Sequence, residues 1–341
     1  MDPLIALPIS EDCMQPRCLQ AASGASSQPS SRLELIREMP HLPSTKCKPV
    51  PIKQVLRPMR GGSQSYLVEA EDRRFYVAKF QNNPQGNRTL LNEWIGSQIL
   101  RACGISAPEV QILELTPAVV RSNPNLCFHF GRRLDPIKAG LHVGSHYPVH
   151  PNRIAVFDFI PERLLDFVVN LEDFVRVYVI DHLLGQADTR QVVFTRERKS
   201  WTKVAFRAWM IDHGMLFGGA EWKIRDIPSY GLYFDRTVYS RIDFWPICHE
   251  VIGYLQSVVA EVFWSSVHSA PAEWFGVDNE SDLKHLFRLI NARLEKWLTI
   301  IELHKTALDD VTRNGKQTFR QFAPAPNLAP MSEIALTGTF G

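Results

Sequence analysis

Two charged residues stand in segments where a charge needs a partner. Lys79 lies in the apolar run Val77-Ala78-Lys79-Phe80, where an unpaired ammonium group would be costly to bury. Glu93 lies on the helical segment that follows, beside its apolar stripe, and is the candidate anion for Lys79. The alternatives are a strand-end lysine that reaches solvent and a solvated helix carboxylate.

Two aspartates flank a predicted β-hairpin. Asp188 lies in the loop GQADTRQ before the hairpin, and Asp212 ends its apolar second strand, just before His213-Gly214. Each acid alone is compatible with an ordinary turn former. Because the two ends of one hairpin lie close together, however, the two carboxylates would either repel each other or share a divalent cation.

A glycine-rich turn precedes the strand that carries Lys79. It reads Arg60-Gly61-Gly62-Ser63-Gln64-Ser65, and glycines let backbone N–H groups approach an anion while the serine hydroxyls donate further hydrogen bonds. A plain hairpin turn is the alternative. Together, the glycine turn, strand lysine, helix glutamate, loop aspartate and strand-end aspartate are the parts that phosphoryl transfer uses in kinases.

Hydrophobic periodicity predicts the elements that must position these residues. Residues 52–160 are expected to form a small lobe of antiparallel sheet with one main helix, and Gly104 marks the end of that helix. Residues 117–153, dense in Pro, Gly, His and Asn, predict a long irregular insertion. The expected strands and helix follow in the order 52–56, 66–70, 75–80, helix 87–103 and strand 109–115.

Residues 161–313 are expected to form a second, mostly helical lobe. It contains a capped helix at 171–184, a hairpin built from VVFTR and FRAWMI, and two long helices at about 246–267 and 281–308. The predicted fold class is therefore α+β with two lobes. The Ser- and Pro-rich leader 1–51 and the tail 314–341 have compositions that cannot repay ordering entropy.

Composition excludes several classes of protein. With 341 residues, 45% hydrophobic and 22% charged, the chain is globular and has room for about two domains. A net charge of +2 disfavours a nucleic-acid binder that covers phosphates. Gln256 and Glu261 interrupt the best apolar run, so no membrane span is expected. The six cysteines are scattered without a C-x-x-C pair, which favours reduced thiols and a cytoplasmic location.

The order of these features resembles the HipA-like kinases, relatives of the phosphatidylinositol 3-/4-kinase-like group. The segments that carry the resemblance run from about Arg60 to Tyr239. This resemblance implies a bilobal, protein-kinase-like fold that binds ATP and Mg²⁺ and transfers the γ-phosphate to a hydroxyl of an unknown protein or small molecule. The segments are GGSQSYLVEA, FYVAKF, LLNEWIGSQIL, GLHVGS, AVFDFIPERLL, GQADTRQVVF and WMIDHGMLFGG.

The resemblance also implies a role for each residue. Lys79 corresponds to the lysine that orients the nucleotide phosphates, and Glu93 to the helix glutamate that pairs with it. Asp188 corresponds to the catalytic aspartate that accepts the substrate hydroxyl's proton, and Asp212 to the strand-end aspartate that binds magnesium. The residues implied to contact the nucleotide are Gly61, Gly62, Ser63 and Gln64 of the phosphate-covering loop, and Phe157 and Phe159 of the hinge beside adenine.

The chain departs from the family's pattern at the second metal-binding position. An asparagine usually follows the catalytic aspartate by five residues, but that position is Val193 here, which cannot ligate magnesium. A shortened loop would bring Gln191 into this metal-binding role, and Gln186 replaces another common asparagine. The departures keep two hypotheses open, an active kinase and a catalytically weak or inactive nucleotide-binding interaction module. A nucleic-acid-binding regulator is a third, disfavoured by the near-neutral charge.

Overall fold

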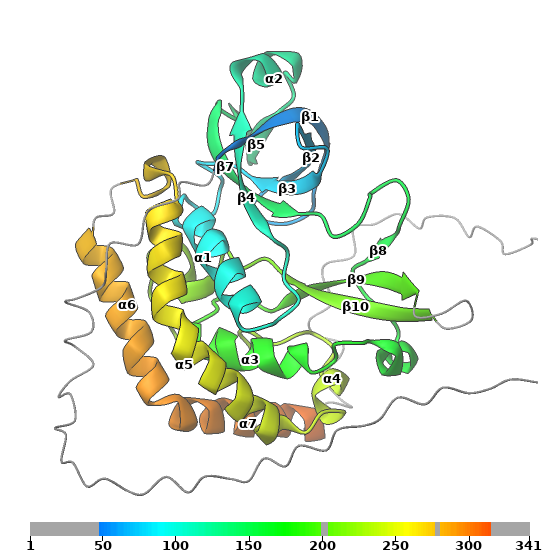
Figure 1. Cartoon of the computed structure of the whole chain (residues 1–341), viewed down its shortest axis with the longest axis vertical. Coiled ribbons are helices and arrows are strands. Elements are labelled where there is room, and N and C mark those ends of the chain that lie inside the picture. Colours follow the sequence, from blue (N-terminus) through cyan, green and yellow to red (C-terminus); the bar gives the residue numbers. More distant parts are fainter. Residues whose placement is uncertain (1–47, 199–203, 277–279, 315–341) are drawn as a thin grey trace, which may run out of the picture. The chain divides into compact units, whose positions relative to one another are not determined.

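The strands predicted around Lys79 close into a small β-barrel (Figure 1). The computed structural model describes residues 48–198, 204–276 and 280–314, all of them within Ser44–Gly341, one of two units into which the chain divides. Neighbouring barrel strands are antiparallel except β1 and β4, whose parallel pairing closes the barrel. The strand order is β1 (Val50–Pro58), β2 (Tyr66–Ala70), β3 (Phe75–Lys79), β7 (Gly140–His146) and β4 (Val110–Leu115).

Strand β7 comes from the segment that the sequence predicts to be an irregular insertion, 117–153. The prediction is wrong for Gly140–His146, which pair with β3 on one side and β4 on the other. Glycine obscured the strand signal, yet Gly144 is required because a Cβ there would lie 2.4 Å from a methyl group of Leu113. The rest of the insertion forms helix α2 (Pro117–Ser122) and a two-stranded ribbon, β5 (Cys127–Phe130) and β6 (Arg133–Pro136).

The expected leader extends two residues too far. Val50 and Pro51 belong to β1, where they pair with Leu113 and Glu114 of β4, because these pairs are needed to close the barrel. The rest of the leader up to residue 47, and the tail after residue 314, lie outside the described residues.

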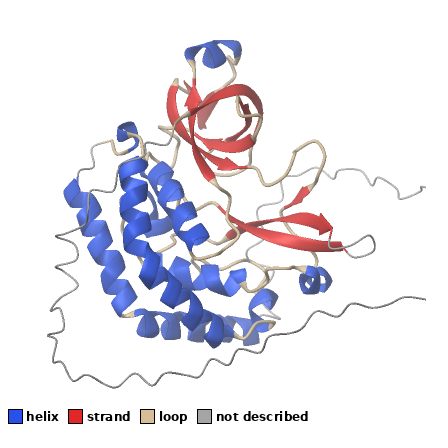
Figure 2. Cartoon of the chain, in the orientation of Figure 1, coloured by secondary structure: helices blue, strands red, loops and turns tan. Residues whose placement is uncertain are grey.

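The main helix predicted for residues 52–160 packs mainly on the C-terminal helices and also contacts β4 and β7 of the barrel. Helix α1 (Arg88–Ala102) lies against helix α5 (Phe244–Ser269) (Figures 1 and 2), and the Trp94 indole N–H donates to the Ser266 carbonyl at 2.9 Å. The apolar face of α1 shares one core with the C-terminal helices, whereas the barrel encloses a separate core. Helix α1 is therefore an anchor that connects the barrel to the helical part.

The predicted C-terminal helices are present, with one difference. The single helix expected at 281–308 is divided at Lys296 into α6 (Glu280–Glu295) and α7 (Trp297–Asn314), and both pack on α3 (Asp173–Leu184). The short elements of this part are η1 (Glu162–Phe167), η2 (Leu216–Glu221), α4 (Thr237–Ser240) and η3 (Ala272–Trp274). No helix among the described residues is long and apolar enough to cross a membrane.

The second hairpin has the register that a site at its open end needs. Strands β9 (Gln191–Arg198) and β10 (Val204–Ile211) are antiparallel, with Gln191 directly opposite Ile211. A short strand, β8 (Val156–Phe157), completes the sheet on the other side of β9. The mixed α+β class predicted from the sequence is thus present, and the loop before β9 ends beside the residue that follows β10.

Two of the cysteines have the inert environment that the sequence predicts. Cys103 and Cys248 are buried free thiols, and burial raises the pKa of each to about 12. A thiol with so high a pKa supplies almost no thiolate near neutral pH.

A stacked pair of buried histidines should make the folded protein sensitive to acid. The rings of His182 and His304 stack 3.9 Å apart, and burial holds the pKa of His182 well below its ordinary value. The folded state therefore favours neutral His182, so its stabilising effect is present above about pH 6.5 and is lost as the pH falls below that value. Between about pH 7 and pH 5 we expect a loss of roughly 2 kcal/mol from such a group.

Urea unfolding at the two pH values measures this loss. The variant His182→Phe keeps a ring against Tyr178, which packs edge-on to His182 at 4.3 Å, and removes one titrating group. Its free energy of unfolding should fall less between the two pH values than that of the parent chain. An identical fall in both proteins would contradict the prediction.

Candidate active site

Lys79 ends strand β3 between two carboxylates. Its Nζ lies 2.7 Å from Oε2 of Glu93 and 2.6 Å from Oδ1 of Asp212. Burial alone would lower the pKa of Lys79, but the Asp212 and Glu93 carboxylates outweigh it and raise the pKa. The structure thus brings together three of the residues that the sequence singled out, over separations of 14 and 133 positions, with the lysine ionised.

Glu93 is held by more than the lysine. Its Oε1 accepts a hydrogen bond from the Ser145 hydroxyl of β7 at 2.9 Å, and its Oε2 accepts one from the His213 backbone N–H at 2.8 Å. Burial would raise its pKa, but Lys79 and His213 outweigh burial and lower it. Glu93 is therefore a buried, ionised carboxylate that links β7 of the barrel to His213 after β10. It is not the solvated helix carboxylate that the sequence left as an alternative.

Asp212 follows β10 with a backbone φ of 60°. One carboxylate oxygen contacts Lys79, and Oδ2 accepts a hydrogen bond from Gln191 Nε2 at 2.9 Å. Burial would raise the pKa of Asp212, but Lys79 outweighs burial and lowers it. The side chain keeps 24% of its surface exposed, so an ionised carboxylate is open to a ligand. Gln186 Nε2 lies 3.5 Å from the Asp212 carbonyl.

The oxygen donors around Asp212 suit a magnesium ion, the metal that the family resemblance implies. Magnesium takes one or two carboxylates and completes its shell with water and substrate phosphates. Gln186 Oε1 is buried and has no hydrogen-bond partner among the described residues. In the part of the chain that the structure describes, no group of three or more His, Cys, Asp or Glu side chains is placed to hold a metal. Asp212 is the carboxylate that could hold the ion, and the Gln191 and Gln186 amides, which contact Asp212, could add oxygen ligands.

Asp188 lies in the turn that precedes β9. It is half-buried, and its Oδ1 accepts a hydrogen bond from the Thr189 backbone N–H at 2.7 Å. The neighbouring Ala187 N–H donates to the Met215 carbonyl at 2.8 Å, so this turn runs alongside the segment after Asp212. The hairpin register thus brings both acidic segments to one end of the β-ribbon.

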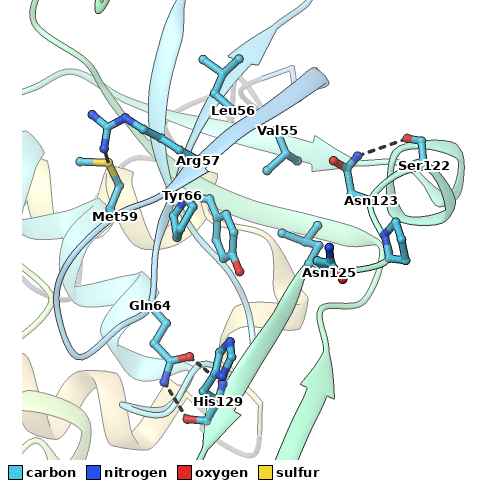
Figure 3. Close-up of a pocket in the computed structure, with 13 residues that line it drawn as sticks. Val55, Leu56, Arg57, Met59, Gln64, Tyr66, Ser122, Asn123, Asn125 and His129 are labelled. Atoms are coloured by element: carbon cyan, nitrogen blue, oxygen red, sulfur yellow. Dashed lines mark hydrogen bonds between the residues drawn. The ribbon is translucent and has the colours of Figure 1, made fainter.

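The glycine-rich turn is fastened to the insertion. The Gln64 side chain donates to the His129 carbonyl at 2.8 Å and accepts from the His129 N–H at 2.7 Å, and Figure 3 shows the two residues facing each other. A Cβ on Gly62 would lie 2.9 Å from Gln85 Nε2. Gln64 therefore anchors the loop, beside a cavity of about 630 Å³ between β1 and the α2–β5 segment.

The two phenylalanines predicted to form the hinge pack on different parts of the chain. The Phe157 ring packs on the second sheet, and the Phe159 ring packs on the segment near residue 234. Phe157 in β8 packs edge-on against Phe206, with ring centroids 6.2 Å apart, and Phe159 lies 5.7 Å from Phe234. Both side chains keep more than a third of their surface exposed. Both rings are thus partly exposed and lie, in chain order, between β7 and η1.

Sequence reasoning missed Asn92, which fastens α1 to the segment after Asp212. Its side-chain N–H₂ donates to the carbonyls of Gly214, Leu216 and Gly219 at 2.9, 2.9 and 3.1 Å, and its oxygen accepts from the Trp222 indole at 2.9 Å. The only signal in the sequence was an amide in the apolar run LLNEWIG, which burial obliges to find partners.

Comparison with known proteins gives one family match. Residues 52–134 match the sequence profile of the HipA-like kinases, about a quarter of the chain, which includes the glycine-rich turn, Lys79 and Glu93. Asp188 and Asp212 lie beyond the matched residues. The search of curated proteins gave no match.

Several solved kinase structures are similar at low identity. The Golgi casein kinase with Mn/ADP bound is 15% identical, with 74% of this chain and 73% of that chain covered and a TM-score of 0.44. The Helicobacter pylori proinflammatory kinase CtkA is 12% identical, with coverage of 76% and 97% and a TM-score of 0.44. HipA of Shewanella oneidensis, solved with HipB and operator DNA, is 11% identical, with coverage of 82% and 75% and a TM-score of 0.38.

TM-scores this low assign no residue a role. The profile match falls on the segment whose motifs suggested the resemblance. The resemblance to the HipA-like kinases seen in the sequence is confirmed by this match over residues 52–134.

Proposed function

We propose that this protein is an ATP-dependent, cytoplasmic kinase of the HipA-like type with a bilobal arrangement. It would transfer the γ-phosphate of ATP to a hydroxyl on a protein or small molecule. The observation that carries the proposal is the buried contact of Lys79 with both Glu93 and Asp212. In kinases, an ammonium group fixed beside a partly exposed carboxylate binds and orients the nucleotide phosphates.

Each residue has a distinct task in this proposal. Lys79 binds phosphate oxygens, and Glu93 keeps the ammonium group in place. Asp212, with Gln191 and Gln186, would hold Mg²⁺, which when bound neutralises phosphate charge. Asp188 orients the acceptor hydroxyl and takes its proton. The turn at Gly61, Gly62 and Ser63 covers the phosphates, and Phe157 and Phe159 flank the adenine.

Phosphoryl transfer can be tested without knowing the acceptor. Purified chain with ATP and Mg²⁺ should release ADP or phosphorylate itself. Asp188→Asn should lower that rate at least about 100-fold, because a positioned base contributes factors of this size, with nucleotide affinity unchanged. Asp166→Asn is the control, since this acid is exposed and pairs with Arg241. Equal inactivity of the parent chain and Asp188→Asn would contradict the proposal.

A second function is favoured by one specific observation. Val193 lies within β9 opposite Trp209, at the position where the family's metal-binding asparagine is expected, so a ligand there is lost. We therefore keep as the alternative a nucleotide-binding interaction module with weak or no turnover. Calorimetry that detects ATP–Mg²⁺ binding, together with no measurable ADP release, would favour it. Recovery of turnover in Gln191→Asn would locate the defect.

A further inference from the structure

A buried arginine contacts the residues on both sides of Asp212. The φ of 60° at Asp212 is uncommon for a residue with a side chain and persists only where the surroundings enforce it. Arg190 Nη1 donates to the Ile211 carbonyl at 2.8 Å and contacts Nδ1 of His213 at 3.1 Å. Because a guanidinium only donates, Nδ1 of His213 is the acceptor. One group of Arg190 thus fixes the residues before and after Asp212.

The other edge of the guanidinium is fixed to helix α3. Nε donates to Oδ2 of Asp181 at 2.8 Å and Nη2 donates to Oδ1, and both side chains are fully buried. The Arg190 backbone N–H also donates to the Leu232 carbonyl at 3.0 Å. Gly231 packs so closely on Asp181 that a Cβ would lie 2.7 Å from it. The position of Arg190 is therefore set from three directions.

These contacts leave Asp212 free for its own partners. All three guanidinium nitrogens contact Asp181, Ile211 or His213, whereas the Asp212 carboxylate contacts Lys79 and Gln191. Asp181 also balances the buried charge of Arg190, which would otherwise be a costly uncompensated cation.

We propose that Arg190, seated on Asp181, is a positioning residue that holds Asp212 in its left-handed conformation and so aims the carboxylate at the metal of a nucleotide complex. It acts through the backbone of Ile211 and the ring of His213 and touches neither metal nor nucleotide. The effect on metal binding rests on the proposed function, whereas the effect on the backbone of Asp212 rests on the structure alone. Each effect has its own test.

The first test uses a variant in which the ion pair is removed without leaving a charge. In Asp181→Leu/Arg190→Met, apolar groups of similar volume replace a buried pair, a change that proteins tolerate. Calorimetry with ADP in EDTA and in excess Mg²⁺ gives the gain in affinity due to the metal. We expect ADP affinity without metal within about twofold of the parent, and a metal-dependent gain reduced at least about tenfold.

A matched variant controls for the general effect of removing an arginine–aspartate pair that also binds backbone carbonyls. Arg293 contacts the Asp226 carboxylate and donates to the carbonyls of His182 and Leu183, so Asp226→Leu/Arg293→Met removes a similar set of contacts away from Asp212. It should keep the metal-dependent gain. If the Arg190 double variant does not fold, Arg190→Lys replaces it, because lysine keeps the cation for Asp181 but cannot also reach the Ile211 carbonyl and the His213 ring. A folded variant that keeps the gain overturns the proposal.

The second test needs no nucleotide. The His213 backbone N–H donates to Glu93, so its hydrogen exchange reports the conformation at Asp212. We expect exchange at least about tenfold faster in the Arg190 double variant, with amides of α5 unchanged. If the parent chain shows no metal-dependent gain, the proposed function fails and exchange decides the inference: faster exchange supports the positioning role and unchanged exchange overturns it.

Discussion

Lys79→Met is expected to lower kcat/KM for ATP-dependent phosphorylation by roughly 100- to 1,000-fold, the range found when one preorganised electrostatic group is removed from an active site. The physical reason is the position of Nζ, within 2.7 Å of two carboxylates, where it can also meet phosphate oxygens. Without the cation, Glu93 and Asp212 lose their shared counter-ion, and their pKa values should rise. Steady-state kinetics with ATP, with ADP release as readout, measure the effect.

Lys53→Met provides the matched control for this prediction. Lys53 also pairs with a glutamate, Glu69, at 2.7 Å, but half of its side chain is exposed, so its loss should change neither kinetics nor stability appreciably. If Lys79→Met were as active as Lys53→Met, the central role of the lysine would be wrong. Circular dichroism and thermal unfolding of both variants separate lost chemistry from lost folding.

Glu93→Leu is expected to reduce the free energy of unfolding by about 3–5 kcal/mol, the range for breaking a buried ion pair from one side. The variant leaves Lys79, the Ser145 hydroxyl and the His213 N–H without their shared acceptor. Glu93→Gln keeps the shape and part of the acceptor capacity, so its loss should be smaller. Urea unfolding near pH 7 measures both.

The pH dependence of that loss identifies its origin. The folded pKa of Glu93 is lowered, so its contribution is present above the ordinary carboxyl pKa and is lost as the pH falls through the folded pKa. The difference between parent and Glu93→Leu should therefore narrow below roughly pH 4. Glu109→Leu, which removes an exposed pair with Arg74, should change stability by less than about 0.5 kcal/mol at any pH. If Glu93→Leu lost no more stability than Glu109→Leu, the prediction would be wrong.

Local patterns in the sequence were sufficient for most of the elements. Strands β2 and β3, helix α1 and the β9–β10 hairpin lie where alternation, helical spacing and turn residues place them, because these signals act over a few neighbouring residues. Strand β7 was missed because two glycines, Gly140 and Gly144, weaken its strand pattern. Gly144 lies close to Leu113 of β4, a contact that no local pattern records.

The candidate site was predictable only as separate parts. A lysine in an apolar strand and a glutamate beside a helix stripe each needed a partner, and burial made their pairing a reasonable prediction. Asn92, Asp181 and Arg190 carried only the weaker signal of a polar side chain in or beside an apolar segment. Their partners are backbone carbonyls and side chains far along the chain, which composition does not specify.

The sequence by itself determined which chemistry is available, since residue type sets charge, proton affinity and ligand capacity. The tertiary structure alone decided that Lys79 meets Glu93 and Asp212, that α1 joins the helical core, and that Arg190 holds the left-handed turn. The physical reason is that these contacts bridge residues up to 172 positions apart. Their geometry follows from how the barrel, helices and hairpin pack together, whereas the patterns that predict each element end within it.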